Sequence, residues 1–567
     1  MRKSLYSLIL LAAVGLLAYS NTFYSPFEFD DFSSITENPL VKNLDNFTAS
    51  LKGYEYNPRR FIGYLSFALN YHVGGLDVTG YHIVNLSVHI INAVLVYLLV
   101  ILIFRTPYFI LSGGSSVRFF GSRFTMGDSD FIALFSALLF LSHPVQTQAV
   151  TYIVQRFTSL ATLFYLLSVV FYIKGRLHSQ RAEGKGQSAG KEERKDKPSM
   201  HHALSPLLFY AGSLLSAVCA MKTKEIAFTL PVVIILVEFI FFGSSLKKKL
   251  LFLLPVLLTL VVIPLSILGT ERPLGEILSD LSEKTRVQSN ISRGDYLMTE
   301  MRVITTYIRL IFFPVNQNLD YDYPVYHSFF SPPVLLSFLF LVSIFGVAIY
   351  LLYRSQGEKC AGQGTGEGQG GEIVTSAPCP MPYAYYRLIA FGIFWFFITL
   401  SVESSVIPIA DVIFEHRLYL PSVGAFISIA ASAFWAAERL GEKWPVTKKI
   451  LIPLSLALIV LLAGASFARN TVWQTESGLW GDVVEKSPSN ARAQHNLGLS
   501  YQNRKMADEA AEQYRIALTL KPDYAIAHNN LGLIYAEKGL TNKTIEQYRS
   551  ALRVSPDYAA AHNNLGM

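Results

Sequence analysis

The sequence predicts an all-α protein, in which a polytopic bundle of membrane helices is followed by a solenoid of paired helices. Of the 567 residues, 51% are apolar and only 16% are charged, whereas about a quarter of the residues of a soluble protein are charged. The apolar runs stop near residue 467, and a polar sequence with a 34-residue period follows. The first observation predicts the bundle, and the second predicts the solenoid.

The apolar runs are numerous enough for about eleven membrane spans, because each span needs about 20 mainly apolar residues. Several runs are shorter and depend on their flanks to reach this length. The first run follows Arg2 and Lys3, and we expect a retained anchor because no clear small-residue cleavage site comes after it. The runs lie near 5–23, 81–104, 131–143, 157–173, 205–221, 226–243, 250–268, 332–353, 386–402, 421–438 and 449–467.

The basic residues predict how the bundle is oriented. Lys and Arg occur in every connection that is cytoplasmic when the N-terminus lies inside, as the positive-inside rule requires. The low-complexity loops 179–200 and 355–380 are then cytoplasmic, disordered linkers. The outer side holds the loop 24–80 and the segment 269–331, and an apolar-periodic stretch in each predicts a helix along the interface. These stretches are 60–71 and 296–313.

We therefore expect an integral membrane protein, of the inner or plasma membrane if bacterial, with a cytoplasmic N-terminus and an extracytoplasmic C-terminal domain. The net charge of +7 comes from the basic connections, so no nucleic-acid partner is predicted. Cys219 lies in an apolar run, and Cys360 and Cys379 lie in a predicted cytoplasmic loop, so no disulfide is expected. The predicted parts are a membrane domain (1–470), a linker (471–487) and a repeat domain (488–567).

The C-terminal period is that of tetratricopeptide repeats. Leu497–Gly498 recurs as Leu531–Gly532, and Tyr514 recurs as Tyr548, so that small residues let paired helices approach while the tyrosines fill the space between them. Two repeats are complete, and a third stops after part of one helix. One asparagine recurs in the first helix of each repeat and predicts a ladder of amides that binds an extended peptide of an acceptor or partner protein, the alternative being a solvated face. These residues are Asn496, Asn530 and Asn564.

The first outer loop contains a pair of carboxylates, Asp30 and Asp31, in the aromatic-rich stretch Glu28–Asp31. A carboxylate just outside a membrane can act as general base towards a hydroxyl acceptor from the water side, while a lipid-borne donor arrives from the bilayer. The alternative is a turn, in which Asp bonds the nearby backbone. Because adjacent residues of an extended segment point to opposite sides, the two carboxylates cannot share one role equally.

Two arginines at the outer edges of apolar runs, Arg156 and Arg417, are candidates for binding a phosphate, since a guanidinium offers bidentate hydrogen bonds. The alternative is an interfacial arginine whose charge reaches the headgroups. Glu415 and His416, which crowd beside Arg417, favour a functional role there. Elsewhere on the outer side, Lys224–Glu225 is interpreted as an internal ion pair that supports the catalytic loop.

Other outer motifs receive structural interpretations. Asp320–Tyr321–Asp322 is similar to the metal-binding DxD of soluble nucleotide-sugar transferases, but two carboxylates are few ligands for a divalent ion, and a turn is preferred. Arg59–Arg60 either lines the first loop or contacts lipid headgroups, and His143–Pro144 is expected to end a helix. We therefore expect no metal site and no cofactor, with a divalent metal left open.

Together these features resemble the transmembrane and tetratricopeptide-repeat O-mannosyltransferase-like family, within the membrane glycosyltransferases of the C-type fold. The resemblance covers essentially the whole chain and rests on the order of short motifs along it. The chain differs from the eukaryotic members in having barely more than two repeats. The motifs are Phe29–Asp31 with Asn38–Pro39, His143–Pro144 with Arg156, Lys224–Glu225, and Glu415–Ser422.

The resemblance implies inverting transfer of a sugar, such as mannose, from a polyprenyl-phosphate donor to a hydroxyl on the extracytoplasmic side, with a protein as the expected acceptor. It favours Asp30 as the base, with Asp31 orienting the acceptor or an active-site cation. Arg156 and Arg417 would then stabilise the charge of the leaving lipid phosphate. The expected partners are the polyprenyl-phosphate-linked sugar, a protein and membrane lipid.

Two other classes of function compete with this interpretation. A non-catalytic membrane anchor that displays repeats for protein binding is the main alternative, because the repeats alone suffice for it. Such an anchor needs neither about eleven spans nor acidic and basic outer loops. A transporter is disfavoured, because it would place charges within the spans or break paired spans with Gly and Pro, whereas the polar residues here lie in outer loops.

Overall fold

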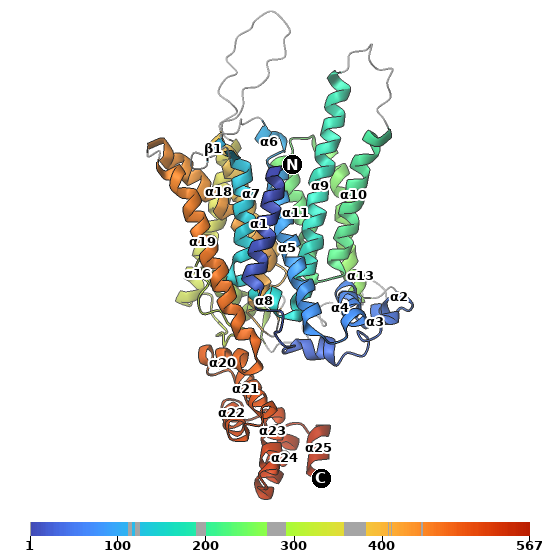
Figure 1. Ribbon diagram of the computed structural model, residues 1–567, viewed down its shortest axis with the longest axis vertical. Coiled ribbons are helices and arrows are strands. Elements are labelled where there is room, and N and C mark those ends of the chain that lie inside the picture. The colour runs from blue at the N-terminus through green and yellow to red at the C-terminus, as the bar shows by residue number, and fades with distance from the viewer. Residues whose placement is uncertain are drawn as a thin grey trace, which may run out of the picture.

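The chain folds into a bundle of helices with the repeats attached to one end (Figure 1). The N-terminus lies at the end of the bundle away from the repeats, and we name the two ends the N-terminal end and the repeat end. The predicted all-α class is confirmed. The computed structural model describes residues 2–110, 116–118, 125–188, 200–268, 291–356, 381–405, 408–409, 411–443 and 446–566.

The bundle is built from long apolar helices, because a helix satisfies its own backbone hydrogen bonds where no water is available. Every predicted apolar run overlaps one of these helices or a consecutive pair of them. The helices are α1 (Arg2–Tyr19), α5 (Val78–Ile103), α7 (Asp128–Ser142), α9 (Arg156–Ser188), α10 (Met200–Met221), α11 (Leu230–Phe241), α12 (Leu246–Leu258), α13 (Val262–Leu268), α16 (Pro332–Gln356), α17 (Met381–Leu400), α18 (Tyr419–Lys443) and α19 (Val446–Thr471).

Fewer membrane spans than the predicted eleven or so are found when helix length and composition alone are used to count them. In the described residues, 6 helical stretches are long and apolar enough to span a bilayer, and a pair bent by 54° at His143 would make 7. Three further apolar helices are shorter, so the predicted count of about eleven stays a prediction. The bend follows from His143–Pro144, since α7 ends at Ser142 as predicted. In α16 and α19 only 17% of the most apolar 18-residue stretch is buried inside the protein, which places both helices at the lipid-facing periphery.

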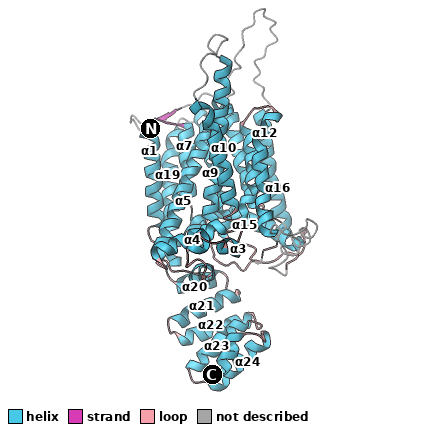
Figure 2. Ribbon diagram, turned by 90° about the vertical axis from the view of Figure 1, so that its right-hand side faces the viewer, coloured by secondary structure: helices cyan, strands magenta, loops and turns pink. Residues whose placement is uncertain are grey.

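Short helices gather at the repeat end of the bundle. The two predicted interfacial helices are α4 (Phe61–Gly74) and α15 (Arg293–Phe312), and Figure 2 shows both at this end, close to the first helices of the repeat domain. The other short elements are η1 (Phe32–Thr36), α2 (Asp45–Thr48), α3 (Lys52–Tyr56), η2 (Pro144–Gln146), α8 (Thr147–Thr151), η3 (Ile153–Gln155), η4 (Glu225–Thr229), η5 (Thr259–Val261) and η6 (Glu415–Leu418).

The N-terminal end carries the remaining short elements, α6 (Pro107–Ile110) and an antiparallel pair of three-residue strands, β1 (Ser116–Arg118) and β2 (Thr125–Gly127). Of the two predicted linkers, 189–199 and 357–380 lie outside the described residues. Helix α9 continues to Ser188, which is further than its apolar run predicts.

The repeat domain is a stack of helix pairs, as predicted. A Cβ atom added to Gly498 would lie 2.8 Å from the Tyr514 ring, and one added to Gly532 would lie 2.5 Å from the Tyr548 ring. Only glycine therefore permits the tyrosine ring to lie this close to the first helix of each repeat, which explains why glycine and tyrosine both recur after 34 residues. The elements are η7 (Val472–Gln474), α20 (Glu476–Lys486), α21 (Ala491–Asn503), α22 (Ala507–Leu520), α23 (Ala525–Glu537), α24 (Thr541–Val554) and α25 (Ala559–Gly566).

The predicted linker, 471–487, is a folded part of the junction between bundle and repeats. It contains α20, whose first turn is capped by Thr475, because this side chain accepts from the backbone N–H of Gly478. The buried side chains of Trp473 and Trp480 share one apolar cluster with the first outer loop and with α21. The segment is short and has few apolar residues, so the sequence did not reveal that it packs against the first outer loop.

The bundle holds a buried ion pair, which corrects the expectation that the polar residues lie in the outer loops. Arg176 and Glu238, on α9 and α11, lie 2.6 Å apart, and Tyr172 donates to the same carboxylate at 2.9 Å. The guanidinium of Arg176 also lies over the ring of Phe252, 4.2 Å from its centroid. The partners satisfy both charges, so this pair ties two helices together and gives no support to a transport pathway.

The opposite placement of the N-terminus and the repeats supports a direct test of topology. In a cysteine-free background, a cysteine at Gly190 should react only with a reagent on the cytoplasmic side, and one at Leu540 only with a reagent on the outer side. The reason is the Lys/Arg bias of the connections. Labelling of both positions from one side of sealed vesicles would contradict the orientation.

Candidate active site

The carboxylate pair lies where the first outer loop meets the repeat domain. Asp31 is buried, and its two oxygens accept from the backbone N–H groups of Glu28 at 2.9 Å and Val154 at 2.7 Å. Burial raises the pKa of Asp31 to about 8, although these N–H groups oppose the shift. Asp31 thus closes the loop onto η3, which is a structural use of its carboxylate.

Asp30 has the opposite character, because its side chain is exposed. Its backbone N–H donates to the hydroxyl of the buried Tyr152 at 2.8 Å, which fixes the residue, and Tyr152 also contacts the carboxylate. Partial desolvation raises the pKa of Asp30, and Tyr152, Arg492 and Arg60 oppose this shift. The two adjacent carboxylates therefore differ in their surroundings, with Asp30 as the accessible member. The segment is helical at Asp31 and not extended as predicted, and Asp31 binds backbone where a contact with the acceptor or a cation was predicted.

Glu28 is a third carboxyl in the same stretch. Within the described part of the chain, neither of its side-chain oxygens has a hydrogen-bond partner, and the residue is 1% exposed. Burial raises its pKa to about 9, and the negative charges of Glu476 and Asp31 add to this shift. Glu28 is therefore a neutral acid at pH 7 and does not compete with Asp30 as a base.

This assignment predicts a specific pH dependence of stability. The folded-state pKa of Glu28 lies above its unfolded value of about 4.3. The folded chain keeps the proton that the unfolded chain releases, so stability falls as the pH rises from about 4 towards 9. We expect Glu28→Gln to raise the thermal unfolding temperature more at pH 8 than at pH 5. The exposed Glu37 of the same loop provides the control, Glu37→Gln, which should show no such difference; an equal effect of Glu28→Gln at both pH values would contradict the assignment.

Arg156 is enclosed by protein and 0% exposed. Its Nε donates to Asn85 at 2.6 Å, its Nη1 to Asn70 at 2.6 Å, and its Nη2 to the carbonyl of Tyr81 at 3.0 Å. The guanidinium also lies 4.7 Å from the ring centroid of Phe67. These bonds tie α4, α5 and α9 together. The geometry argues against the predicted contact with a donor phosphate, because the guanidinium already uses its donors inside the protein.

Arg417 is also buried, and it organises the loop before η6. Its Nη1 donates to the carbonyl of Val412 at 2.9 Å and its Nη2 to that of Asp411 at 2.6 Å. Glu300 of α15 lies 4.0 Å away, and burial raises the pKa of this carboxyl to about 7, while Arg417 opposes the shift. Arg417 therefore holds backbone in place and has two carboxyls nearby, those of Glu300 and Glu403.

The two residues before Arg417 bind neighbouring segments. Glu415 accepts from the backbone N–H of Asn318 at 2.7 Å and from the hydroxyl of Tyr321 at 2.6 Å, which anchors the loop after α15. The backbone N–H of His416 donates to Gln148 at 2.7 Å. In the part of the chain that the structure describes, the buried Nδ1 of His416 has no hydrogen-bond partner.

Lys224 and Glu225 take different partners, which corrects the predicted internal pair. The ammonium of Lys224 lies 2.8 Å from Glu403, and burial lowers its pKa. Glu225 lies 3.4 Å from both Arg59 and Arg60, and although burial alone raises its pKa, these arginines lower it to about 2. The backbone turns at this point, so the two adjacent side chains diverge.

Arg59 and Arg60, the two partners of Glu225, have access to solvent, since their side chains are 44% and 37% exposed. Arg60 lies 5.3 Å from the centroid of the Phe157 ring, and its charge opposes the rise in the pKa of Asp30. The structure therefore places an accessible carboxylate and accessible arginines in one region at the repeat end. The sequence singled out Arg59–Arg60 without assigning them to this site.

Asp320 of the Asp320–Tyr321–Asp322 motif forms an ion pair with Arg492, the second residue of α21. This pairing uses the carboxylate that a metal ion would need. Among the described residues, no group of three or more His, Cys, Asp or Glu side chains has a geometry suited to a metal ion. The motif therefore serves the junction between the loop and the repeats.

The predicted asparagine ladder is present, and its amides bond along the stack. Asn530 lies 3.1 Å from the Nε2 of His495, and Asn564 donates to Asn529 at 2.9 Å. The Nδ1–H of His495 donates to the side-chain oxygen of Asn496 at 3.0 Å. All three predicted residues are partly exposed, so the ladder connects successive repeats and still reaches the surface.

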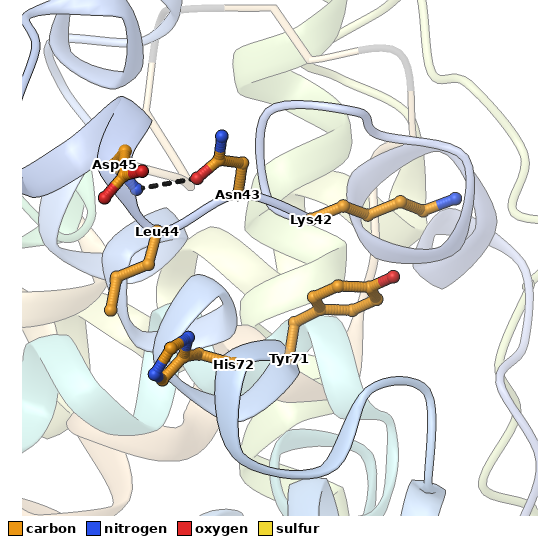
Figure 3. Close-up of a pocket in the computed structure, with 6 residues that line it drawn as sticks. All are labelled: Lys42, Asn43, Leu44, Asp45, Tyr71 and His72. Carbon is orange, nitrogen blue, oxygen red and sulfur yellow. Dashed lines mark hydrogen bonds between the residues drawn. The ribbon is translucent and has the colours of Figure 1, made fainter.

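A separate pocket of about 410 Å³ is lined by residues of the first outer loop (Figure 3). Its lining comes from the segment before α2 and from the end of α4. The backbone N–H of Asp45 donates to the side chain of Asn43 at 2.9 Å, which shapes one wall. None of the candidate residues lines it. The lining residues are Lys42, Asn43, Leu44, Asp45, Tyr71 and His72.

The fold and the site define an integral membrane protein with tetratricopeptide repeats and a cluster of carboxylates and arginines where the two parts meet. Family models described as "TPR repeat" and "Tetratricopeptide repeat" match residues 507–539 and 525–558. Helices α22, α23 and α24 occupy these residues.

The chain is similar over most of its length to proteins named as protein O-mannosyl-transferases. It is 23% identical to F38B6.6 of Caenorhabditis elegans, covering 92% of this chain and 64% of that one. It is 24% identical to human TMTC2, covering 89% and 61%, and 22% identical to Tmtc3 of Drosophila melanogaster, covering 92% and 56%. The predicted resemblance is confirmed, and the chain spans about three fifths of the length of these relatives.

One solved structure gives no further argument. The likeness to the crystal structure of the APC/C hetero-tetramer Cut9-Hcn1 has a TM-score of 0.18 and 13% identity, over 77% of this chain and 89% of that one.

Proposed function

We propose that the protein is a membrane glycosyltransferase that transfers mannose from a polyprenyl-phosphate donor to a hydroxyl of a protein acceptor at the repeat end. The observation that carries the proposal is the division between the two carboxylates, because Asp30 is exposed while Asp31 is used by the backbone. The similarity to proteins named as O-mannosyl-transferases supports the sugar and the protein acceptor. The apolar outer faces of α16 and α19 suit a protein that draws a donor from the bilayer.

The proposed reaction is a single displacement with inversion at the sugar. Asp30 accepts the proton of the acceptor hydroxyl, and the hydroxyl oxygen forms the new bond to the anomeric carbon. The bond between that carbon and the phosphate oxygen breaks, and the polyprenyl phosphate leaves with the electron pair. Atoms and charge balance without an oxidant, a reductant or a cofactor, so the proposal includes no cofactor.

The leaving phosphate needs cations near the membrane surface. We assign this role to Arg59 and Arg60, with Lys224 nearby, and no longer to Arg156. Arg59 and Arg60 are partly exposed, and both pair with the one carboxylate of Glu225. Because a guanidinium can hold a carboxylate and a phosphate oxygen on different edges, the pair retains donors for the phosphate. Arg417 contributes by holding the loop that carries Asp411.

The repeats provide the proposed contact with the protein acceptor or a partner protein. The amides of the asparagine ladder are partly exposed on successive helices, which suits an extended peptide that crosses the repeats. The outer location of these repeats and the cytoplasmic N-terminus remain part of the proposal.

The test uses the full chain in nanodiscs with a synthetic polyprenyl-phosphate mannose and an acceptor peptide rich in Ser and Thr. We expect one hexose to be added per modified hydroxyl, detected by mass spectrometry, and no addition from a soluble nucleotide sugar. If the chain binds the peptide but transfers no sugar with any acceptor tried, the anchor alternative would replace the proposed function.

A further inference from the structure

Arg492 departs from the pattern of the repeats in which it lies. The first helices of successive repeats begin Ala–Arg–Ala, Ala–Ile–Ala and Ala–Ala–Ala, so that Arg492 corresponds to Ile526 and Ala560. Ile526 is exposed, and Ala560 is only a methyl group, so repeat packing does not require a long cationic side chain here. Arg492 must therefore serve a partner outside the repeat stack.

That partner is the membrane domain. The Nε and Nη2 atoms of Arg492 donate to the two oxygens of Asp320 at 2.7 and 2.8 Å, in a bidentate pair. Nη2 also donates to Asp411 at 2.6 Å, and the guanidinium carbon lies 5.4 Å from the centroid of the Phe29 ring. Charge-assisted bidentate bonds are the strong kind, and they fix the direction of the guanidinium as well as its distance.

Two of these three contacts, those with Phe29 and Asp411, lead directly to the candidate active site. Phe29 precedes Asp30 and has a φ of 49°, a region that a non-glycine residue adopts only when its surroundings hold it there. The side chain of Asp411 binds Arg492, while its carbonyl accepts from Arg417 at 2.6 Å. One guanidinium of the repeat domain therefore contacts the segments that carry Asp30 and Arg417.

Further contacts beside Arg492 join the repeat domain to the membrane domain, and we call this interface the joint. Lys486 donates to the carbonyl of Gln317 at 2.8 Å, and Ser487 accepts from the side chain of Asn318 at 2.9 Å. The ring of Trp480 meets that of Phe29 edge to face, with their centroids 5.7 Å apart. The junction is therefore a built interface with an apolar centre and a polar rim, and Arg492 lies beside Asp30 within it.

We propose that Arg492 is a positioning residue that makes the first repeat helix part of the candidate active site, by holding Phe29 and the Asp320 and Asp411 loops around Asp30. This inference rests on the proposed function and extends it, because the repeats then have a second role besides binding a protein. Undocking of α21 would release the strained Phe29 and remove a cation that acts on Asp30. Transfer would then depend on the docking of the repeats.

The test compares full-length Arg492→Ala with the wild type. Alanine occurs at the equivalent position of the third repeat, so the helix should fold. We expect faster hydrogen–deuterium exchange in peptides that cover 27–33 and 317–322. We also expect kcat with polyprenyl-phosphate mannose to fall about 10- to 100-fold, as for a small misplacement of reacting groups, with the donor KM nearly unchanged.

The pH profile of kcat/KM separates a positioning residue from a merely structural one, because loss of a merely structural residue would not shift it. The groups that act on Asp30 are Tyr152, Arg492, Asp411 and Arg60. Because Arg492 opposes the rise in the pKa of Asp30, its loss should move the acid limb of kcat/KM to higher pH. Arg492→Lys keeps the charge and loses the fork, so it should preserve the acid limb and still speed exchange.

Two further variants complete the design. Asp320→Asn removes the bidentate partner from the membrane side and should reproduce the faster exchange without any change in the repeats. Arg515→Ala removes an exposed arginine of α22, paired with Glu512 at 2.8 Å, and serves as the control. If Arg492→Ala and Asp320→Asn exchange as slowly as Arg515→Ala, the docking role is overturned whatever the activity. If the wild type transfers no sugar while Arg492→Ala still exchanges faster, the proposed function and the positioning role fail, and the joint itself is confirmed.

Discussion

Replacing Asp30 by Asn should slow sugar transfer about 10²- to 10⁴-fold, which is the loss expected when a general base is removed. The substitution keeps the size of the side chain and removes its basicity. The contact that fixes this residue is made by its backbone N–H to Tyr152 at 2.8 Å, so the loop should keep its conformation. Donor affinity should change little, because the proposed phosphate contacts come from Arg59 and Arg60.

Single-turnover transfer rates and donor-binding affinities, measured in parallel, check this prediction. Glu37→Gln neutralises an exposed carboxyl of the same loop and should leave the rate unchanged. Asp31→Asn should instead lower the thermal unfolding temperature, because an amide NH₂ would face a backbone N–H of Glu28 or Val154. A near-normal rate for Asp30→Asn, in an otherwise active protein, would rule out the base and leave the exposed carboxylate without a role.

The sequence was sufficient for the fold class because its two signals are local. Apolar runs and a 34-residue period can be read without knowing which elements touch. The glycines at 498 and 532 show this, since the close approach predicted from their recurrence is present in the structure. The linker 471–487 shows the limit, because its tryptophans pack against a loop more than 400 residues away in the chain.

The candidate site was predictable only in part, for the same reason. The sequence predicted that Asp30 and Asp31 differ, but for the wrong reason, because it assumed an extended segment and Asp31 is helical. The difference comes from tertiary partners, since Asp31 accepts from the backbone N–H of Val154. Whether an arginine is available to a ligand depends on its tertiary partners, which separates Arg60 from Arg156. Arg492 was missed because we looked for residues that recur between repeats, whereas Arg492 is one that does not recur. A comparison of Arg492 with Ile526 and Ala560 would have revealed it.

Arg156→Ala should destabilise the protein by about 3 kcal/mol or more, because it leaves several buried polar groups without partners. The side chains of Asn85 and Asn70 and the carbonyl of Tyr81 would each lose the donor that satisfies them. Arg156→Lys should be almost as harmful, since one ammonium cannot reach acceptors on three sides of the guanidinium. Arg515→Ala, on the exposed face of α22, is the matched control and should have a normal unfolding temperature.

Thermal unfolding in detergent and donor binding by the folded fraction together separate the two roles considered for Arg156. A structural residue predicts a lower unfolding temperature and an unchanged affinity for polyprenyl-phosphate mannose in the molecules that remain folded. The double variant with Asn85→Ala should cost less than the sum of the single variants, because the two side chains satisfy each other at 2.6 Å. A normal unfolding temperature with a large loss of donor affinity would reverse the assignment, because a guanidinium spent on Asn85, Asn70 and Tyr81 cannot also hold the phosphate.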